Sequence, residues 1–185
     1  MREKPERLAW NILVAAFAVF LAITGGVIYS AQWFVFQSSV PLNARLSVAR
    51  GTVRVILPDS GEPLAVADRR DHLEPGTVIQ TDATSQAILT FTEERTGNPV
   101  TSVTLFRNSE LTILEGSSPR YRLNNRNNRV SLVLPEGRVG LLHLRPGESY
   151  TTLISLSTPH AEVSPGDRAD VTVNVTEQRT RVSSY

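Results

Sequence analysis

Hydrophobic and polar positions divide this chain into two parts with different periods. Residues 8–44 contain no Asp, Glu, Lys or Arg, and residues 8–29 form a nearly unbroken apolar run. A helix over residues 8–29 rises about 33 Å, which is enough to cross a hydrocarbon layer of about 30 Å. The pattern therefore predicts one transmembrane helix over residues 8–29, followed by a membrane-proximal connector over residues 30–45.

From residue 46 onward the helical period is lost, and short runs of alternating apolar and polar residues replace it. Pro, Gly, Asn, Asp and Ser close these runs, as is typical of β-strands and turns. We expect strands at residues 50–55, 78–82, 86–91, 103–105, 111–113, 130–134, 138–144, 150–156, 170–176 and 179–183.

Turn signals between these runs predict how the strands pair. Residues 83–85, 107–110 and 135–137 each separate two neighbouring strands, so each is expected to close a hairpin. We also expect turns at residues 58–61 and 177–178, a polar loop at 93–99 and a charged connection at 67–74. Residues 46–185 are thus predicted to form one all-β domain, a sandwich or a β-roll/solenoid-like fold, made mostly of antiparallel hairpins.

Charges around the apolar run predict its orientation. Arg2, Lys4 and Arg7 precede the run, whereas no charge follows it until Arg45. Because basic residues stay on the cytoplasmic side, we expect residues 1–7 in the cytoplasm and an extracytoplasmic β domain at the cytoplasmic (inner) membrane. A cleaved signal peptide is the competing interpretation, but the long apolar run and the bulky Tyr29 at the candidate cleavage site favour an uncleaved anchor.

Small residues recur along one side of the predicted helix. Ala18, Ala22, Gly26 and Ser30 follow one another at intervals of four, which places them on one helical face. Such a face lets a second helix approach closely. The alternative is a chance alignment, since small residues are common in membrane helices. The hypothesis is a helix-packing face for a protein partner.

Aromatic residues mark the expected membrane boundaries. Trp10 lies near the inner end of the apolar run, and Tyr29 and Trp33 lie near its outer end. Tyr and Trp rings favour the headgroup level of a bilayer. We therefore expect these three side chains to act as membrane-interface anchors.

Charge and composition exclude several classes of function. The net charge is +1, and the chain after residue 7 holds 16 basic and 16 acidic residues (19 − 3 and 18 − 2). This balance disfavours a nucleic-acid-binding domain, which would carry a basic excess. The chain contains no cysteine, which excludes disulfides, thiolate chemistry and cysteine-based zinc sites.

Candidate catalytic and metal-binding residues are few. His72, His143 and His160 are the three histidines, and no two of them have the spacing of metal ligands. The acidic residues around His72 alternate with arginines, which favours a solvated charged loop over a cation site. The sequence has no phosphate-binding glycine loop and no nucleophile motif. We expect no enzyme activity, no cofactor and no metal site.

One segment of the predicted domain is rich in arginine. Arg120, Arg122, Arg126 and Arg129 lie within residues 119–129, which contain no acidic residue. Guanidinium groups at this density suit phosphates, acidic sugars or lipid headgroups. The segment is therefore a candidate anion-binding loop, and the alternative is an exposed loop without a ligand.

Six short segments carry a family pattern. They are ARGTV at residues 49–53, LEPGTVIQTD at 73–82, AILTF at 87–91, VTLFRNSEL at 103–111, LVLPEGRV at 132–139 and STPHA at 157–161. In their order and spacing they resemble the FecR-like domain family. The resemblance implies a β-rich domain outside the cytoplasmic membrane, and the best-known members relay a signal from an outer-membrane iron transporter to a sigma factor.

The chain departs from those signal relays in two respects. Only seven residues precede residue 8, so we expect no cytoplasmic anti-sigma region and no sigma-factor role. Residues 165–168 read PGDR where the family usually has Arg-Gly-Thr, and the chain stops at Tyr185 where the family continues into a further strand. Either the sequence belongs to a longer protein or its last strand pairs with something else.

These observations favour a non-enzymatic, single-pass membrane protein that presents a FecR-like β domain as a protein-interaction or scaffold module. The expected partners are the lipid bilayer and proteins that bind the transmembrane helix or the β domain, and not nucleic acid. Two alternatives stay open. One is an accessory subunit of a larger membrane complex, and the other is an envelope sensor that binds anionic glycan or lipid through the arginine-rich loop.

Overall fold

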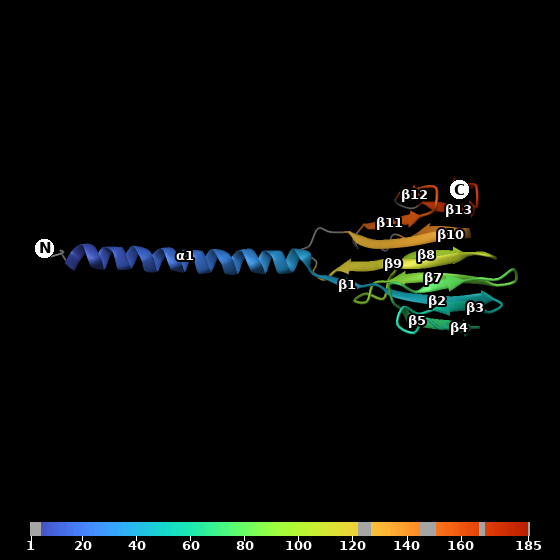
Figure 1. The fold of residues 1–185 in the computed structure, drawn as a ribbon, viewed down its shortest axis with the longest axis horizontal. Helices are drawn as coiled ribbons and strands as arrows, with labels where there is room; N and C mark the ends of the chain where they lie inside the picture. The colour runs from blue at the N-terminus through green and yellow to red at the C-terminus, as the bar shows by residue number, and fades with distance from the viewer. Residues whose placement is uncertain (1–4, 122–126, 145–150, 167–168, 185) are drawn as a thin grey trace.

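A computed structural model of the chain describes residues 5–121, 127–144, 151–166 and 169–184. One long helix leads into a β domain and projects away from it, so that the first described turn of the helix lies far from the strands (Figure 1). The predicted fold class, a mostly antiparallel β domain after one N-terminal helix, is confirmed.

The helix α1 (Pro5–Gln37) spans 33 residues, which corresponds to a rise of about 50 Å. Its segment Ala9–Gln37 is long and apolar enough to cross a membrane, and its most apolar stretch is not buried against the rest of the chain. By length and composition this helix is suited to act as a membrane anchor or as a signal sequence.

The helix extends further than the sequence pattern indicated. The predicted connector at residues 30–45 is helical through Gln37, where α1 ends. At the next residue, the backbone N–H and the hydroxyl of Ser38 both donate to the carbonyl of Phe34, at 3.1 and 2.6 Å. This closes the last turn four residues before Pro41, and the chain passes directly into β1 (Ser39–Pro41).

Strands occupy most of the remaining described residues. They are β2 (Asn43–Arg50), β3 (Val53–Ile56), β4 (Pro63–Val66), β5 (Arg69–Leu73), β6 (Val78–Gln80), β7 (Gln86–Thr92), β8 (Pro99–Leu105), β9 (Glu110–Pro119), β10 (Asn128–His143), β11 (Thr152–Ser157), β12 (Glu162–Val163), β13 (Asp170–Thr176) and β14 (Arg179–Ser184).

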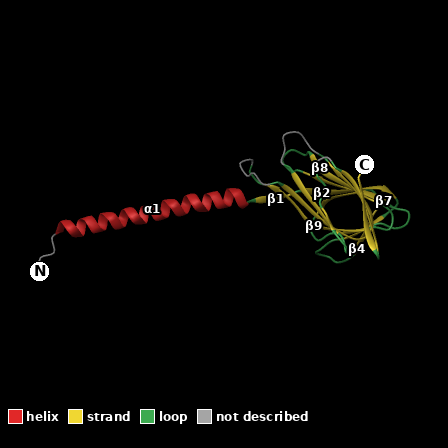
Figure 2. Cartoon of the chain, turned by 90° about the horizontal axis from the view of Figure 1, so that it is seen from above, coloured by secondary structure: helices red, strands yellow, loops and turns green. Residues whose placement is uncertain are grey.

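The strands form two sheets that share one strand. Sheet A has the order β4-β3-β6-β9-β10-β11-β12, with β1 also paired to β9, and sheet B has the order β5-β2-β7-β8-β10-β13-β14. The first half of β10 pairs in sheet A and its second half in sheet B, which joins the two sheets into one. Seen from above, this sheet curls until it is nearly closed (Figure 2).

Alternate residues of the strands point into a shared core. In β7, for example, Ala87, Leu89 and Phe91 are fully buried while the residues between them are partly exposed. Across the core, a Cβ at Gly116 of β9 would lie 3.2 Å from the Phe91 ring. The alternation of apolar and polar residues that predicted the strands therefore corresponds to the alternation of buried and exposed side chains.

Three turns predicted to close hairpins instead join one sheet to the other. Residues 83–85 lead from β6 in sheet A to β7 in sheet B, residues 107–110 lead from β8 back to β9, and residues 135–137 lie inside the continuous β10. In none of these three places do the flanking segments pair with each other. The predicted strands beside these three turns lie within observed strands, but they do not pair with each other as predicted. The strands β1 and β4, the pair-forming β12 and most of β2 were not predicted.

Close packing of three residues explains these crossings. The Thr81 hydroxyl donates to the Phe106 carbonyl at 2.6 Å and accepts from the Ser109 N–H at 3.0 Å. The Ser109 hydroxyl accepts from the Arg138 N–H at 2.8 Å. At Gly137 φ is +99°, and a Cβ there would lie 2.4 Å from Ser109 Cα. We call Thr81, Ser109 and Gly137 the corner cluster.

Other local predictions are confirmed or refined. The turns at residues 58–61 and 177–178 and the loop at 93–99 close the hairpins β3–β4, β13–β14 and β7–β8. The predicted strand at 50–55 is divided at Gly51, where φ is +73°, so that β2 and β3 belong to different sheets. The predicted charged connection at 67–74 contains a strand, β5, which pairs with β2.

Candidate functional site

The helix face predicted from small residues is uncovered. Because α1 is continuous, Ala18, Ala22, Gly26 and Ser30 lie on one side of it, and all four are exposed. A Cβ added at Gly26 would meet no atom within 4 Å. The Ser30 hydroxyl donates to the Val27 carbonyl at 3.0 Å, so its polarity is satisfied within the helix. The face is open to another molecule.

The aromatic residues of α1 have a spacing that suits a bilayer. Trp10 and Tyr29 are separated by about 28 Å along the helix, close to the hydrocarbon thickness of about 30 Å. Trp33 follows about one turn later. All three side chains are exposed. The geometry is compatible with interface anchors, and the anchoring itself stays a prediction.

The arginine-rich segment does not bring its described members together on one loop. Arg120 follows directly after β9, whereas Arg129 lies within β10, opposite Ser117. Arg122 and Arg126 lie outside the described residues. The predicted anion-binding loop is therefore described only at its two ends, which have different surroundings.

Arg120 lies where α1 meets the β domain. Its backbone N–H donates to the Ser38 carbonyl at 3.1 Å, and its guanidinium lies 5.9 Å from the centre of the Tyr121 ring. That ring lies 6.4 Å from the Phe34 ring of α1, tilted by 56°. Cation–π and aromatic contacts of this kind contribute about 0.5 to 1 kcal/mol each. They fasten the end of β9 to the last turn of the helix.

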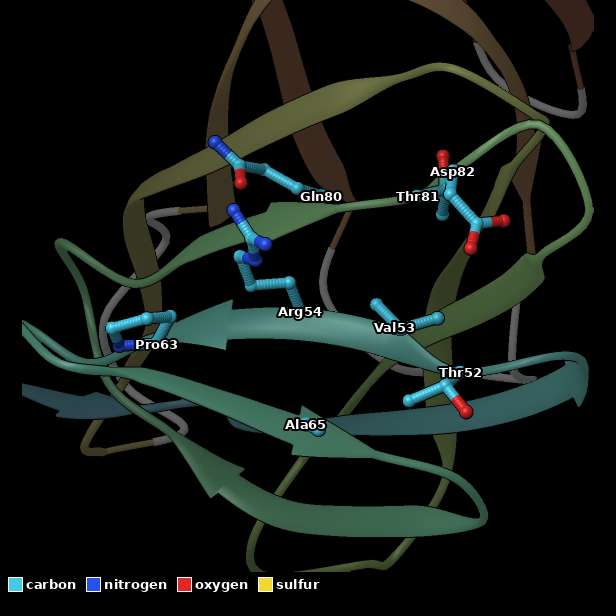
Figure 3. A pocket seen from close by; sticks show the side chains of 8 residues that line it. All are labelled: Thr52, Val53, Arg54, Pro63, Ala65, Gln80, Thr81 and Asp82. Atoms are coloured by element: carbon cyan, nitrogen blue, oxygen red, sulfur yellow. The ribbon is translucent and has the colours of Figure 1, made fainter.

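A groove of about 540 Å³ lies on the outer face of sheet A, over β3, β4 and β6 (Figure 3). Arg54 of β3 is exposed, pairs in register with Gln80 of β6 and lies opposite Ala65 of β4. The Gln80 amide donates to the Glu110 carboxylate of β9 at 2.9 Å. The groove is lined by Thr52, Val53, Arg54, Pro63, Ala65, Gln80, Thr81 and Asp82.

Asp82 supplies a fixed negative charge at one end of this groove. Its Oδ1 accepts hydrogen bonds from the backbone N–H and the hydroxyl of Thr84, at 2.7 and 2.9 Å. Ser85 donates to the same oxygen from its hydroxyl and its N–H, at 2.9 and 2.8 Å. These donors, the Thr84 N–H first, lower the pKa of Asp82 to about 2. The groove therefore presents an anion and the cation Arg54 together.

Asp71 of β5 pairs with two arginines, Arg69 of the same strand and Arg45 of β2. Asp71 Oδ1 accepts from Arg45 Nε at 2.6 Å and from Arg69 Nε at 3.0 Å. The hydrogen bond from Arg69, followed by that from Arg45, holds the pKa of Asp71 below its ordinary value, although partial desolvation opposes the shift. This mutual neutralisation agrees with a solvated structural segment.

The three histidines lie apart from one another. The ring of buried His143 in β10 has Nδ1 at 3.3 Å from the Gly166 carbonyl, and the ring of His160 has Nε2 at 3.3 Å from the Thr176 carbonyl. His72 lies in β5, with φ at +57°. Within the residues that the structure describes, no group of three or more His, Asp or Glu side chains is placed to hold a metal ion.

The groove on sheet A was missed by the sequence interpretation. Arg54 and Gln80 alternate with buried residues along their strands, so their outward direction is visible in the sequence. Their proximity is not, because it depends on the pairing of β3 with β6 across 26 positions.

The chain matches no protein-family model, no curated protein and no solved structure in comparisons with known proteins. The resemblance of residues 49–182 to FecR-like domains therefore stays a hypothesis that only its motifs support.

Proposed function

We propose that this chain is a non-enzymatic, single-pass membrane protein that holds a FecR-like β domain outside the cytoplasmic membrane as a protein-interaction or scaffold module. The observation that carries this proposal is the junction of helix and domain. The apolar helix runs without a break to Gln37, and β1 pairs at once with residues 117–119 of β9. A domain attached in this way keeps a defined position relative to a membrane anchor.

Cysteine labelling tests the membrane anchor and its orientation. The sequence contains no cysteine, so an introduced cysteine is the only thiol that can react. Ser60→Cys in the β3–β4 turn should react with a membrane-impermeant maleimide in intact spheroplasts. Lys4→Cys should react only after lysis. The chain should resist extraction with alkaline carbonate and keep its full mass of 20.4 kDa. Cleavage after the helix, or labelling of the two positions in the reverse order, would refute the proposal.

The groove on sheet A is the surface that we assign to a protein partner. It is hollowed, it is exposed, and it offers charges of both signs from Arg54 and Asp82. A photo-crosslinking amino acid at Ala65 should form a discrete adduct in cells, and Arg54→Glu should abolish that adduct. The same amino acid at Asn174, which is exposed on β13 of sheet B, is the matched control and should form none.

The uncovered helix face supports a second candidate function, an accessory subunit of a larger membrane complex. Close helix packing depends on small side chains, and a Cβ at Gly26 would meet nothing within the chain. Gly26→Leu should therefore release a helix partner during purification in mild detergent, while Ile28→Leu, on the opposite side of the helix from Gly26, should not. A Gly26→Leu variant that kept every partner would remove this candidate.

A further inference from the structure

The two sheets end in strands that have a neighbour on one side only. Along such an edge strand, every second residue directs its backbone N–H and C=O outward, where they can pair with another chain. Proteins usually protect these edges with short strands, prolines, bulges or charged side chains. Among the described residues, the strands with one open side are β1, β4, β5, β12 and β14.

Four of these edge strands are irregular or very short. β1 and β4 contain Pro41 and Pro63, and a proline has no backbone N–H to donate. β5 pairs with β2 through a register shift, and φ of His72 within it is +57°. β12 has only two residues. None of the four offers a long, regular row of free backbone groups.

β14 has none of these features. Its six residues pair with β13 in six consecutive pairs without a register shift, and it contains no proline. Five of the six residues are exposed, so no described segment covers the strand. The Thr158 and Thr180 hydroxyls lie 3.0 Å apart, which ties β14 to the loop between β11 and β12. β14 is therefore a fixed, regular edge with room for one more strand.

Two arginines give one face of β14 a positive charge. Arg179 and Arg181 lie two positions apart, so their side chains leave the strand on the same side. Arg181 pairs in register with Asn174 of β13, whose side chain is exposed on the outer face of sheet B. Neither arginine makes an ion pair within the part of the chain that the structure describes. Both guanidinium groups can therefore bind carboxylates of an added strand.

The other face of β14 continues the core. Val182 pairs in register with Val173, which is fully buried, yet Val182 itself is 48% exposed. An apolar residue opposite Val182 on an added strand would remove more of this side chain from water. The edge therefore suits a strand that is acidic at alternate positions on one face and apolar at its centre on the other.

We propose that β14 binds an extended segment of a partner protein as an additional antiparallel strand, with acidic residues of that segment opposite Arg179 and Arg181. Main-chain hydrogen bonds hold the segment, and the two arginines select it. A second copy of this chain suits the edge less well. Two β14 strands related by a two-fold axis would place four arginines on one face, and like charges on neighbouring strands are destabilising.

This interface goes beyond the groove on sheet A and does not depend on the membrane anchor. The added strand would lie two strand spacings, about 10 Å, from Asn174, with the Arg181 side chain between them. It should therefore not react with a crosslinking amino acid at Asn174. Failure of strand addition would leave the anchor and the groove on sheet A unaffected.

The test uses the full chain in maltoside detergent and fluorescein-labelled peptides, with binding followed by fluorescence anisotropy. In the peptide TTVETES, antiparallel pairing places the valine opposite Val182 and the two glutamates opposite Arg181 and Arg179. This peptide should bind about fivefold more tightly than TTVKTKS. TTVEETS has the same composition, but only one of its glutamates can lie on the arginine face. It should bind about threefold more weakly than TTVETES.

Two double variants separate binding at β14 from a general effect of charge. Arg179→Glu with Arg181→Glu should reverse the preference, so that TTVKTKS binds more tightly than TTVETES. Arg54→Glu with Arg107→Glu makes the same change in net charge at exposed positions outside β14 and should keep the wild-type preference. Because all four side chains are exposed, both variants should melt within a few degrees of the wild type by circular dichroism.

Hydrogen exchange distinguishes strand addition from a loose electrostatic contact. With TTVETES bound, the backbone amides of residues 179–184 that point away from β13 should exchange about tenfold more slowly, because they then pair with the peptide. Equal binding of TTVETES and TTVKTKS, or unchanged exchange of these amides, would refute the proposal. Protection of the same amides without peptide, in step with dimerisation of the chain, would also refute it and assign the edge to a second copy.

Discussion

Buried polar groups have hydrogen-bond partners at one end of β9 and lack them at the other end. At its first residues, the corner cluster pairs the Thr81 and Ser109 groups at 2.6 to 3.0 Å. At its other end, about 30 Å along the strand, the Ser118 hydroxyl and the side-chain amide of Asn128 are buried without a partner. The first end closes the β domain on itself. The second end, beside the helix, is left to water or to a ligand.

This contrast indicates that the stability of the β domain and its attachment to the helix depend on different parts of the molecule. The corner cluster holds the crossings between the sheets, so changes there should unfold the domain. The junction connects the helix to the domain through the β1–β9 pairing and the contact between the Phe34 and Tyr121 rings, so changes to its side chains should alter the orientation of the domain more than its folding. The predictions below test this division, beginning with the largest expected effect.

Gly137→Ala should destabilise the domain by about 2 to 6 kcal/mol. The new Cβ would lie 2.4 Å from Ser109 Cα, at a residue whose φ is +99°. Strain at such a φ costs about 1 to 3 kcal/mol, and overpacking costs about 1 to 3 more. Urea unfolding in detergent, followed by circular dichroism, measures the loss.

The matched control for Gly137 is Gly61→Ala. Gly61 also has a positive φ, +63°, but a Cβ there would meet no atom within 4 Å. Only the conformational cost of about 1 to 2 kcal/mol should remain. Equal losses in the two variants would show that the corner cluster is not closely packed.

Thr81→Val should cost about 2 kcal/mol. The substitution keeps the shape of the side chain but leaves the Phe106 carbonyl and the Ser109 N–H without their partner. The control is Thr92→Val. Thr92 is the last residue of β7, and its partly exposed hydroxyl donates to the Asn43 carbonyl at 3.2 Å. It should cost less than about 1 kcal/mol, since water can replace that bond. A larger loss at Thr92 would reverse the comparison.

The strands were predictable from sequence because burial alternates locally. In β7 and β13 every second residue enters the core, and the pattern shows this without reference to any other strand. The pairing was not predictable, because a turn between two alternating runs looks the same whether it closes a hairpin or crosses between sheets. At residues 135–137, for example, the positive φ of Gly137 and its close approach to Ser109 become visible only with the fold.

The candidate sites divide in the same way. The position of Ala18, Ala22, Gly26 and Ser30 on one side of α1 follows from helical spacing alone, and their packing against a partner stays a prediction. The groove at Arg54 combines strands that are distant in the chain, so no local pattern could indicate it. The extension of α1 from residue 29 to Gln37 was not predicted either, because the apolar and polar residues of this segment lack a clear helical period.

The lowered pKa of Asp82 predicts that the stability of the β domain depends on pH. Its pKa is about 2 in the folded chain and about 3.9 in an unfolded one. Its contribution to stability should therefore be fully present above pH of about 4 and be lost as the pH falls through about 2. Asp82→Asn should flatten the acid unfolding profile in that window. A carbon-13 titration of the Asp82 carboxyl that gives an ordinary pKa would contradict the hydrogen bonds to Thr84 and Ser85.

The smallest effect on stability is expected at the junction, from Tyr121→Ala. This change removes the ring that lies 6.4 Å from Phe34 and 5.9 Å from the Arg120 guanidinium. The loss should stay near 1 kcal/mol, because the β1–β9 ladder is untouched. The position of the domain on the helix should loosen instead. Nitroxide labels at Thr24→Cys and Ser60→Cys should therefore report a broader distance distribution by pulsed electron paramagnetic resonance.

Trp33→Ala is the matched control for this experiment. Trp33 precedes Phe34 on the same helical turn and is 59% exposed, so its removal takes away an aromatic side chain without opening the contact to Tyr121. Its distance distribution should match that of the parent chain. If Tyr121→Ala also leaves the distribution unchanged, the three residue pairs between β1 and β9 are sufficient to orient the domain. The junction would then be as rigid as the corner end, because backbone hydrogen bonds and not side chains would hold it.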